Sequence, residues 1–332
     1  MQTRTLGRTG RPVSVVGLGC WQLGGDWGSV SEDDAMAVLH AAVDAGVTVL
    51  DTADVYGDGR SERLVGRLLR ERAGTGEDAG LTVMTKCGRR ADPHVPEAFT
   101  PQALRAWTDR SRDNLGVDTL DLVQLHCPPT PVYDDDRVFD ALDGLVEQGH
   151  LAAYGVSVET VDEALRAIAR PHVASVQIVL NVFRRKPLEQ VLPAAVEAGV
   201  GIVARVPLAS GLLSGTYDES TTFGEDDHRT YNRSGDAFDV GETFSGVPYD
   251  VGVRAAREVA ALTPEGTTTA QLALRWLVDQ PGVTTVIPGA RNAEQARGNA
   301  AAADLPPLTD EQQDALRDVY DRSVREHVHD RW

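Results

Sequence analysis

The sequence predicts an α/β protein whose parallel strands close into a (β/α)8 barrel, the TIM-barrel architecture. Short apolar runs alternate with amphipathic helical patterns from near the N-terminus to about residue 303. The apolar runs number eight, which favours a closed barrel over an open doubly wound sheet. Polar side chains follow three successive runs, at the barrel end where active sites lie. These three observations together carry the prediction.

The expected strands are short and rich in apolar residues. Several are nearly continuous apolar runs, as in parallel strands that are covered on both faces. The predicted strands cover Val13–Gly19, Val47–Asp51, Leu81–Thr85, Asp121–Leu125, Ala153–Val156, Ala174–Ile178, Gly201–Val206 and Val283–Ile287.

Helices with readable starts lie between these strands. The first begins at Ser31, a capping serine with Asp34 three residues later, and ends at Gly46. The others are expected at Ser61–Leu69, Pro101–Leu115, Val138–Glu147, Val161–Ile168, Leu188–Ala198, Tyr249–Leu262, Thr268–Asp279, Ala293–Ala302 and Thr309–Glu326. The last of these belongs to a C-terminal helix and tail, about 309–332. No proline- or glycine-rich linker divides the chain, so residues 1–332 are expected to form one domain.

One segment interrupts the alternation. Residues 216–248, after the seventh strand, are polar and rich in Gly and Asp, with scattered aromatic residues and no clear period. Loops of this length in compact domains are usually functional lids or disordered segments. Because the segment follows a strand, we expect it at the C-terminal mouth of the barrel, covering the substrate. The alternative is an unstructured insertion.

Composition narrows the class of function. The chain has 32 basic and 50 acidic residues, a formal net charge of −18, which argues against nucleic acids and anionic membranes as main partners. It has no apolar stretch of about 18 residues and no signal-peptide pattern at its start. A cytoplasmic protein is therefore expected. Its three cysteines, Cys20, Cys87 and Cys127, fit reduced thiols better than disulfides.

Four residues carry the predicted chemistry. Asp51 and Tyr56 follow the second strand, Lys86 ends the third and His126 ends the fourth. Singly, each has an ordinary structural explanation, such as a surface lysine or a core histidine. In a parallel barrel, however, the carboxyl ends of successive strands meet at one mouth. The four side chains are therefore expected together.

The quartet suits proton transfer to a substrate oxygen. The unperturbed pKa of tyrosine, about 10, is high for proton exchange near neutrality, and a nearby ammonium group lowers it. Lys86 can supply that charge, and the carboxylate of Asp51 would keep the lysine protonated. His126 could donate a hydrogen bond that orients the substrate.

The sequence resembles the aldo-keto reductases over nearly its whole length. The resemblance is carried by Gly17-Leu-Gly-Cys-Trp21, Asp51-Thr-Ala-Asp-Val-Tyr-Gly57, Thr85-Lys86, Leu125-His126, Gly155-Val-Ser157, Gln177, Pro207-Leu-Ala-Ser-Gly-Leu-Leu-Ser-Gly215 and Ile287-Pro-Gly-Ala-Arg291. It implies NADPH-dependent reduction of a small aldehyde or ketone. It also implies that Asp51, Tyr56, Lys86 and His126 form the catalytic tetrad, with tyrosine as the general acid, on a barrel with an N-terminal β-hairpin and long C-terminal-face loops.

The resemblance also implies a cofactor site. Loops after strands seven and eight of a barrel often bind phosphate, and here they carry glycines and hydroxyls. The loop after strand seven would contact the pyrophosphate, and the loop after strand eight would surround the adenosine 2′-phosphate and adenine. Ser157 and Gln177 would hold the nicotinamide carboxamide. The implied cofactor residues are Ser157, Gln177, Arg205, Pro207, Leu208, Ser210, Gly211, Leu212, Ser214, Gly289, Arg291, Gln295 and Asn299. Trp21 and His126 would contact the substrate.

Three positions depart from the family pattern. Val158 stands where many members have Asn, which removes one carboxamide contact. Arg205 replaces an aromatic residue that stacks on the nicotinamide, although a guanidinium plane can also stack. Gln295 occupies a position that is often Arg, so recognition of the 2′-phosphate would depend on Arg291. NADPH is thus the expected cofactor, and NADH is not excluded.

Other functions compete with this interpretation. The cysteines near the strand ends, with His126, could hold a metal, but no Cys-x-x-Cys pair is present, and no metal is expected. Lys86 could form a Schiff base, as in an aldolase, but Asp51 would keep its amine charged. The main alternative is a slow-turnover NADPH-binding regulatory or redox-sensing module, because the chain is also similar to channel beta-subunit-like relatives. The substrate's identity and the oligomeric state stay open.

Overall fold

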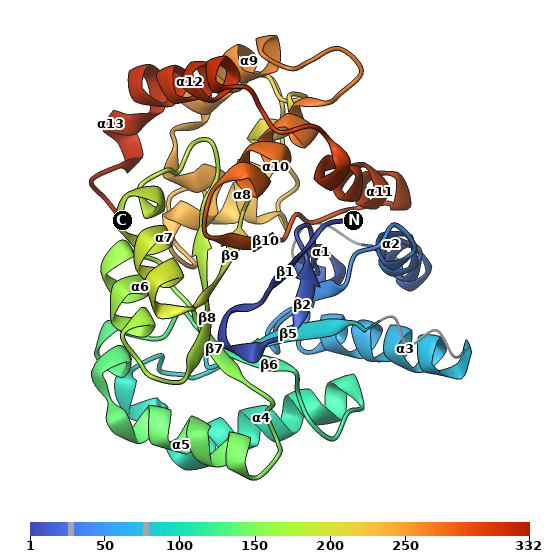
Figure 1. Cartoon of the computed structure of the whole chain (residues 1–332), viewed down its shortest axis with the longest axis vertical. Coiled ribbons are helices and arrows are strands. Elements are labelled where there is room, and N and C mark those ends of the chain that lie inside the picture. The colour runs from blue at the N-terminus through green and yellow to red at the C-terminus, as the bar shows by residue number, and fades with distance from the viewer. Residues whose placement is uncertain (26–29, 76–79) are drawn as a thin grey trace.

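The chain folds into a barrel of eight parallel strands surrounded by helices, as the sequence predicts (Figure 1). The computed structural model describes residues 1–25, 30–75 and 80–332. Within this part of the chain, no helix has the length and apolar character needed to cross a membrane.

The barrel strands follow one another in chain order, and every neighbouring pair is parallel. They are β3 (Leu18–Gly19), β4 (Val49–Asp51), β5 (Thr82–Cys87), β6 (Leu122–His126), β7 (Tyr154–Ser157), β8 (Val173–Val179), β9 (Gly201–Arg205) and β10 (Val283–Val286). Bridges between Val16 and Val286 and between Gly19 and Gly289 bring the first and last strands together. These bridges nearly close the barrel, so its strand ends meet at one mouth.

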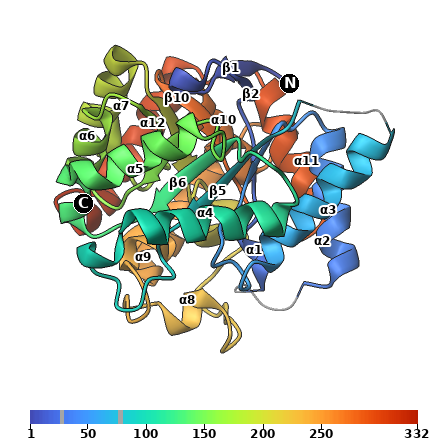
Figure 2. The same ribbon diagram turned by 90° about the horizontal axis from the view of Figure 1, so that it is seen from below.

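An antiparallel hairpin covers the opposite end. It consists of β1 (Thr3–Thr5) and β2 (Pro12–Ser14), and Figure 2 shows it at the end of the molecule away from α8 (His228–Tyr231). Leu6 and Val13 from this hairpin pack with side chains of the barrel interior, including Met84. The hairpin therefore fills the bottom of the barrel and leaves its top for the site.

The first predicted strand is wrong in part. Within the expected run Val13–Gly19, Val13 and Ser14 pair with β1, whereas Val16 bridges to Val286 and Leu18–Gly19 pairs with β4 in the barrel. The run is apolar throughout because it passes from the hairpin into the barrel, and both places are buried. An apolar run marks burial but does not say which strand is the partner.

Several helices begin at capping residues that the sequence shows. Ser31 accepts a hydrogen bond from the backbone N–H of Asp34, and Thr160 with Glu163 forms a capping box. The helices are α1 (Trp21–Gly24), α2 (Glu32–Asp44), α3 (Arg60–Thr75), α4 (Pro101–Leu115), α5 (Asp136–Glu147), α6 (Val161–Ile168), α7 (Pro187–Ala198), α8 (His228–Tyr231), α9 (Tyr249–Ala261), α10 (Thr269–Asp279), α11 (Ala293–Ala301), α12 (Asp310–Val319) and α13 (Arg325–Val328).

Two regions differ from the predicted elements. The expected single helix Thr309–Glu326 is interrupted by a π-helical turn at Tyr320–Val324. The segment 216–248 has local structure that its sequence does not reveal, namely α8 and two 3₁₀ turns, Val240–Glu242 and Phe244–Gly246. Residues 241–247 are all buried, so the alternative of an unstructured insertion does not hold for them.

Candidate active site

A cavity of about 410 Å³ opens at the carboxyl ends of the barrel strands. Its lining includes three of the four residues predicted to carry the chemistry, Asp51, Tyr56 and His126. Residues of the segment 216–248 also line it, among them Tyr217, Arg229 and Glu242. Part of this segment thus lies at the mouth.

The fourth residue, Lys86, lies behind this lining and holds the group together. Its Nζ donates to Asp51 Oδ2 at 2.6 Å, to the carbonyl oxygen of Thr52 at 2.8 Å and to the Tyr56 hydroxyl at 3.3 Å. Gln177 Nε2 donates to the other carboxylate oxygen of Asp51 at 2.7 Å. Because Lys86 and Asp51 are almost fully buried, their charges are paired in a weakly screening environment.

Burial and charge act in opposite directions on the lysine and the tyrosine. Burial acts to lower the pKa of Lys86, but Asp51 and Tyr56 outweigh it, and that pKa lies above its ordinary value. For the phenol, burial raises the pKa of Tyr56 to about 12, although Lys86 acts to lower it. Lys86 thus acts on the pKa of Tyr56 in the expected direction, but the net shift is upward because loss of water outweighs one nearby ammonium.

His126 completes the group as a neutral imidazole. Burial and the nearby cations Arg89, Lys86 and Arg205 hold the pKa of His126 well below its ordinary value. Its ring meets that of Tyr56 edge-on, with centroids 5.9 Å apart. Such a neutral ring can offer one N–H to a substrate oxygen.

Trp21, the expected substrate contact, lies above the tyrosine. Its ring stacks on Tyr56 with centroids 6.0 Å apart and packs against His228 and Phe238 of the segment 216–248. One side of the mouth is therefore an aromatic wall.

The loop after β9 has the backbone geometry of a functional loop. Val206, Ala209 and Ser210 all have positive φ, of 53°, 48° and 54°, a conformation that costs non-glycine residues energy and clusters at ligand sites. The expected cofactor residues on this loop that line the cavity are Pro207, Leu208, Ser210, Gly211 and Ser214. Leu212 is fully buried instead and does not line the cavity.

The loop after β10 forms the far end of the same cavity. Gly289, Arg291, Gln295 and Asn299 all line it. Gln295 Oε1 accepts a hydrogen bond from the backbone N–H of Arg291 at 2.8 Å, and Asn299 Nδ2 donates to the carbonyl oxygen of Gly289 at 3.1 Å. These two hydrogen bonds tie the loop at Gly289 and Arg291 to α11, which carries Gln295 and Asn299.

The two expected carboxamide residues are placed differently. Gln177 lines the cavity while holding Asp51. Ser157 is buried behind the lining, where its hydroxyl lies 3.6 Å from the sulfur of Cys127. Arg205 lines the cavity, and its guanidinium donates to Val158 O at 3.0 Å.

Four charged residues, Arg89, Glu159, Arg205 and Glu242, form a cluster at the mouth. Of these, only Arg205 was predicted from the sequence as a site residue. Arg205 Nη2 donates to Glu159 Oε2 at 2.8 Å and Arg89 Nη2 donates to Glu242 Oε1 at 2.7 Å. Arg205 also lies 3.5 Å from Glu242 and Arg89 lies 3.3 Å from Glu159. Arg89 and Glu159 each come two residues after the end of a strand, β5 and β7, so extending the strand-end argument would have found them. Nothing in the sequence singles out Glu242.

The two carboxyl groups of this cluster, Glu159 and Glu242, have pKa values that are shifted in opposite directions. Burial raises the pKa of Glu159 to about 7, and the charge of Glu242 adds to that rise. Burial also acts to raise the pKa of Glu242, but Arg89 and Arg205 hold it well below its ordinary value. Glu242 therefore carries a negative charge at neutral pH.

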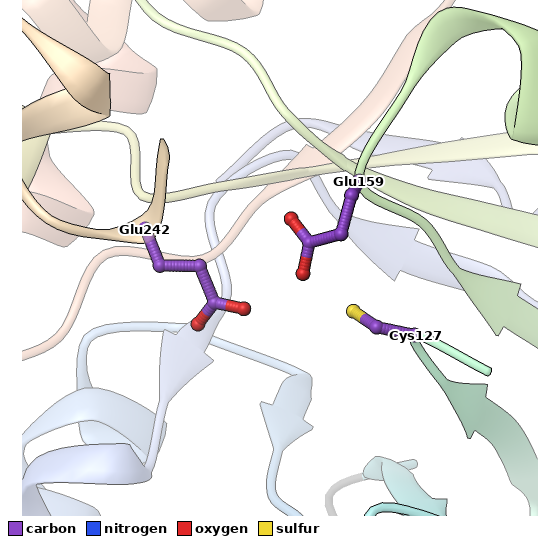
Figure 3. A group of neighbouring side chains, drawn as sticks. All are labelled: Cys127, Glu159 and Glu242. Carbon is purple, nitrogen blue, oxygen red and sulfur yellow. The ribbon is translucent and has the colours of Figure 1, made fainter. Parts of the chain in front are cut away.

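Cys127 lies beside the two carboxylates. In Figure 3 the side chains of Cys127, Glu159 and Glu242 turn toward one another, and their ligand atoms lie within 4.8 Å. The carboxylates are already paired with Arg89 and Arg205, whose charges repel a cation. The other two cysteines are buried free thiols and are not part of this group.

Comparison with known proteins identifies the class. Residues 15–321 match the sequence model of the Aldo/keto reductase family. The chain is 30% identical to the aldo-keto reductase YhdN of Bacillus subtilis over 298 residues, which covers 89% of this chain and 86% of that protein. It is 32% identical over 320 residues to the uncharacterized oxidoreductase Rv2298 of Mycobacterium tuberculosis, covering 92% and 89% of the two chains.

Solved structures agree with this match. The glycerol dehydrogenase AKR11B4 of Gluconobacter oxydans superposes with a TM-score of 0.75 at 30% identity, covering 96% of this chain and 93% of that one. An aldo/keto reductase of Klebsiella pneumoniae in complex with NADP and acetate gives a TM-score of 0.69 at 25% identity, covering 96% and 95%.

The chain belongs to the aldo/keto reductase family. It is an NAD(P)H-dependent oxidoreductase of carbonyl compounds. The sequence-based expectations of the family, the TIM barrel and the enzyme class are confirmed.

Proposed function

We propose that this enzyme reduces an aldehyde or ketone to an alcohol with NADPH as the preferred cofactor, and that Tyr56 is the general acid. The observation that carries the proposal is the contact of the Tyr56 hydroxyl with Lys86, 3.3 Å away and itself paired with Asp51. A phenol that lines the cavity and touches a buried ammonium is suited to releasing its proton as negative charge develops.

The protonation states of the site residues fit reduction of a carbonyl group. Burial keeps the pKa of Tyr56 near 12, so the phenol is protonated at physiological pH and can donate to the carbonyl oxygen. Lys86 then stabilises the phenolate that remains, and the neutral His126 donates a hydrogen bond to the same oxygen. Asp51 keeps Lys86 charged throughout.

The loops after β9 and β10 fit a dinucleotide. A bound reduced nicotinamide supplies the hydride that is added to the carbonyl carbon. Ser210, Gly211 and Ser214 would hold the pyrophosphate, and Arg291 with Asn299 would hold the adenosine end. The positive φ of Ser210 and its neighbours supports this assignment, because such backbone strain is maintained mainly at ligand sites.

Steady-state reduction of 4-nitrobenzaldehyde with NADPH tests the proposal, with Tyr56→Phe measured in parallel. We expect the variant to lose roughly 100-fold or more in kcat while its Kd for NADPH, measured by fluorescence titration, stays within about twofold of wild type. A Tyr56→Phe variant that turns over at the wild-type rate would refute the assignment. Tight NADPH binding without turnover in the wild type would instead favour the regulatory module.

The preference for NADPH is tested at Arg291. Its side chain is half exposed and lines the adenosine end of the cavity, so it can pair with a 2′-phosphate. Arg291→Ala should raise the Kd for NADPH by roughly 10-fold and leave the Kd for NADH unchanged. An NADPH preference that survives the substitution would show that other residues recognise the phosphate.

A further inference from the structure

One wall of the cavity mouth is a loop segment whose position depends on contacts made on its side away from the cavity. Residues 239–247, the wall segment, belong to the long segment 216–248 and carry Glu242 to the cavity. Glu242 is the only member of the charged cluster that the barrel strands and their short loops do not supply. Its position therefore depends on whatever fixes the wall segment.

The last residue of the chain contacts this segment. Trp332 Nε1 donates to both carboxylate oxygens of Asp239, at 3.0 and 3.2 Å, and Asp239 Oδ1 accepts from the backbone N–H of Gly241 at 2.6 Å. The indole is nearly buried, with 7% of its surface exposed. One carboxylate thus joins the tryptophan to the turn that presents Glu242.

The indole ring also fits the shape of the wall segment. Its face lies on the guanidinium of Arg184, 3.5 Å from the ring centroid, and Arg184 donates to the carbonyl oxygen of Ser245 at 3.2 Å. A Cβ atom at Gly246 would overlap the indole, and one at Gly241 would lie 2.9 Å from it. The two glycines leave room for the tryptophan at both ends of the turn.

The front of the wall segment meets the site. Ser210, on the proposed pyrophosphate loop, donates to the carbonyl oxygen of Glu242 at 3.1 Å and accepts from the backbone N–H of Phe244 at 3.0 Å. The Glu242 carboxylate pairs with Arg89 and Arg205. The wall segment is therefore held between Trp332 behind it and the charged cluster in front.

We propose that Trp332 is a positioning residue for the substrate mouth, because it fixes the wall segment so that Glu242 balances Arg89 and Arg205. With Glu159 and Glu242 ionised, the cluster has two positive and two negative charges. Displacing Glu242 leaves a net positive charge at the mouth. Trp332 thereby sets the discrimination between neutral and anionic carbonyl substrates, a consequence that rests on the proposed function.

Two substrates of nearly the same shape measure this discrimination. We would compare kcat/KM for 4-carboxybenzaldehyde with that for its methyl ester at pH 8. Glu242→Gln should raise the ratio of the anionic to the neutral substrate by roughly fivefold or more, because one negative charge leaves the mouth. Trp332→Ala should raise it in the same direction. Trp332→Phe, which keeps a ring on Arg184 but loses the N–H, should give an intermediate value.

Hydrogen exchange tests the anchor without any turnover. Trp332→Ala should speed backbone exchange in residues 239–247 by roughly tenfold or more, while the barrel strands keep their protection. Gly66→Ala, which strains the distant contact between α3 and α4, is the control for general destabilisation. It should lower Tm and leave both the substrate ratio and the exchange of the wall segment unchanged.

Several results would overturn the proposal. These are unchanged exchange in the wall segment of Trp332→Ala, exchange that rises equally in the barrel strands, or a substrate ratio that Glu242→Gln shifts and Trp332→Ala does not. If the wild type reduces neither aldehyde, the proposed reductase function fails on these substrates. The exchange result then decides the anchoring role of Trp332 by itself.

Discussion

The carboxylate of Asp54 should make the stability of this enzyme depend on pH, and Asp54→Asn should remove that dependence. Asp54 is fully buried beside the site. No side chain among the described residues donates a hydrogen bond to it, and the backbone of Val55 is a weak partner. Burial, reinforced by the nearby carboxylate of Glu62, raises the pKa of Asp54 to about 7.

The size and sign of the effect follow from this pKa. In the unfolded chain the pKa of an aspartate is near 3.8, so between pH 4 and 7 the folded protein binds a proton that the unfolded chain does not. Stability from this proton is complete below the unfolded pKa and is lost as pH rises through 7. Integration from pH 5 to pH 8 gives a loss of about 3 kcal/mol in the free energy of unfolding, as an order of magnitude.

Urea unfolding at pH 5 and pH 8 measures this loss. The wild type should lose about 3 kcal/mol more than Asp54→Asn between the two pH values, because asparagine cannot ionise. Asp113→Asn, which removes an exposed carboxylate, should behave like the wild type. If Asp54→Asn and the wild type show the same pH dependence, then Asp54 is already ionised in the folded protein at pH 5 and the reasoning is wrong.

Three further substitutions test the packing of the fold and of the site. Lys86→Met should lower the free energy of unfolding by about 3–5 kcal/mol, because it leaves the buried Asp51 carboxylate without its paired charge. Urea titration should show that adding Asp51→Asn restores part of this loss. Strictly additive losses in the double variant would contradict the pairing. Gly66→Ala should cost about 1–3 kcal/mol, because its Cβ would overlap a backbone carbonyl of α4; a thermal melt at the wild-type Tm would contradict this overlap. Gly211→Ala should weaken NADPH binding roughly tenfold, since φ is 97° and a tyrosine hydroxyl fills the space; fluorescence titration giving the wild-type Kd would argue against a cofactor role for this loop.

The sequence by itself determined the barrel and most of its mouth. Apolar runs mark buried strands, capping residues mark helix starts, and strand ends of a parallel barrel meet at one edge. Asp51, Tyr56, Lys86 and His126 could therefore be brought together from their spacing alone. The roles expected for residues of the loops after β9 and β10 came instead from the resemblance to the family, because glycines and hydroxyls after a strand also occur in ordinary turns.

Other features depend on residues that are distant in the chain. The run Val13–Gly19 looks like one strand, but the partners of its two ends lie in different sheets. The pKa of Tyr56 is raised although Lys86 touches it, because the depth of burial is a property of the folded molecule.

The contacts of the charged cluster and of Trp332 also could not be predicted from the sequence. Glu242 meets Arg89 across 153 positions of sequence, and Trp332 meets Asp239 across 93. Periodicity and capping report only on neighbours within a few residues along the chain. The tertiary structure alone decided these pairs, because charge pairing and burial depend on distance in space rather than on distance in sequence.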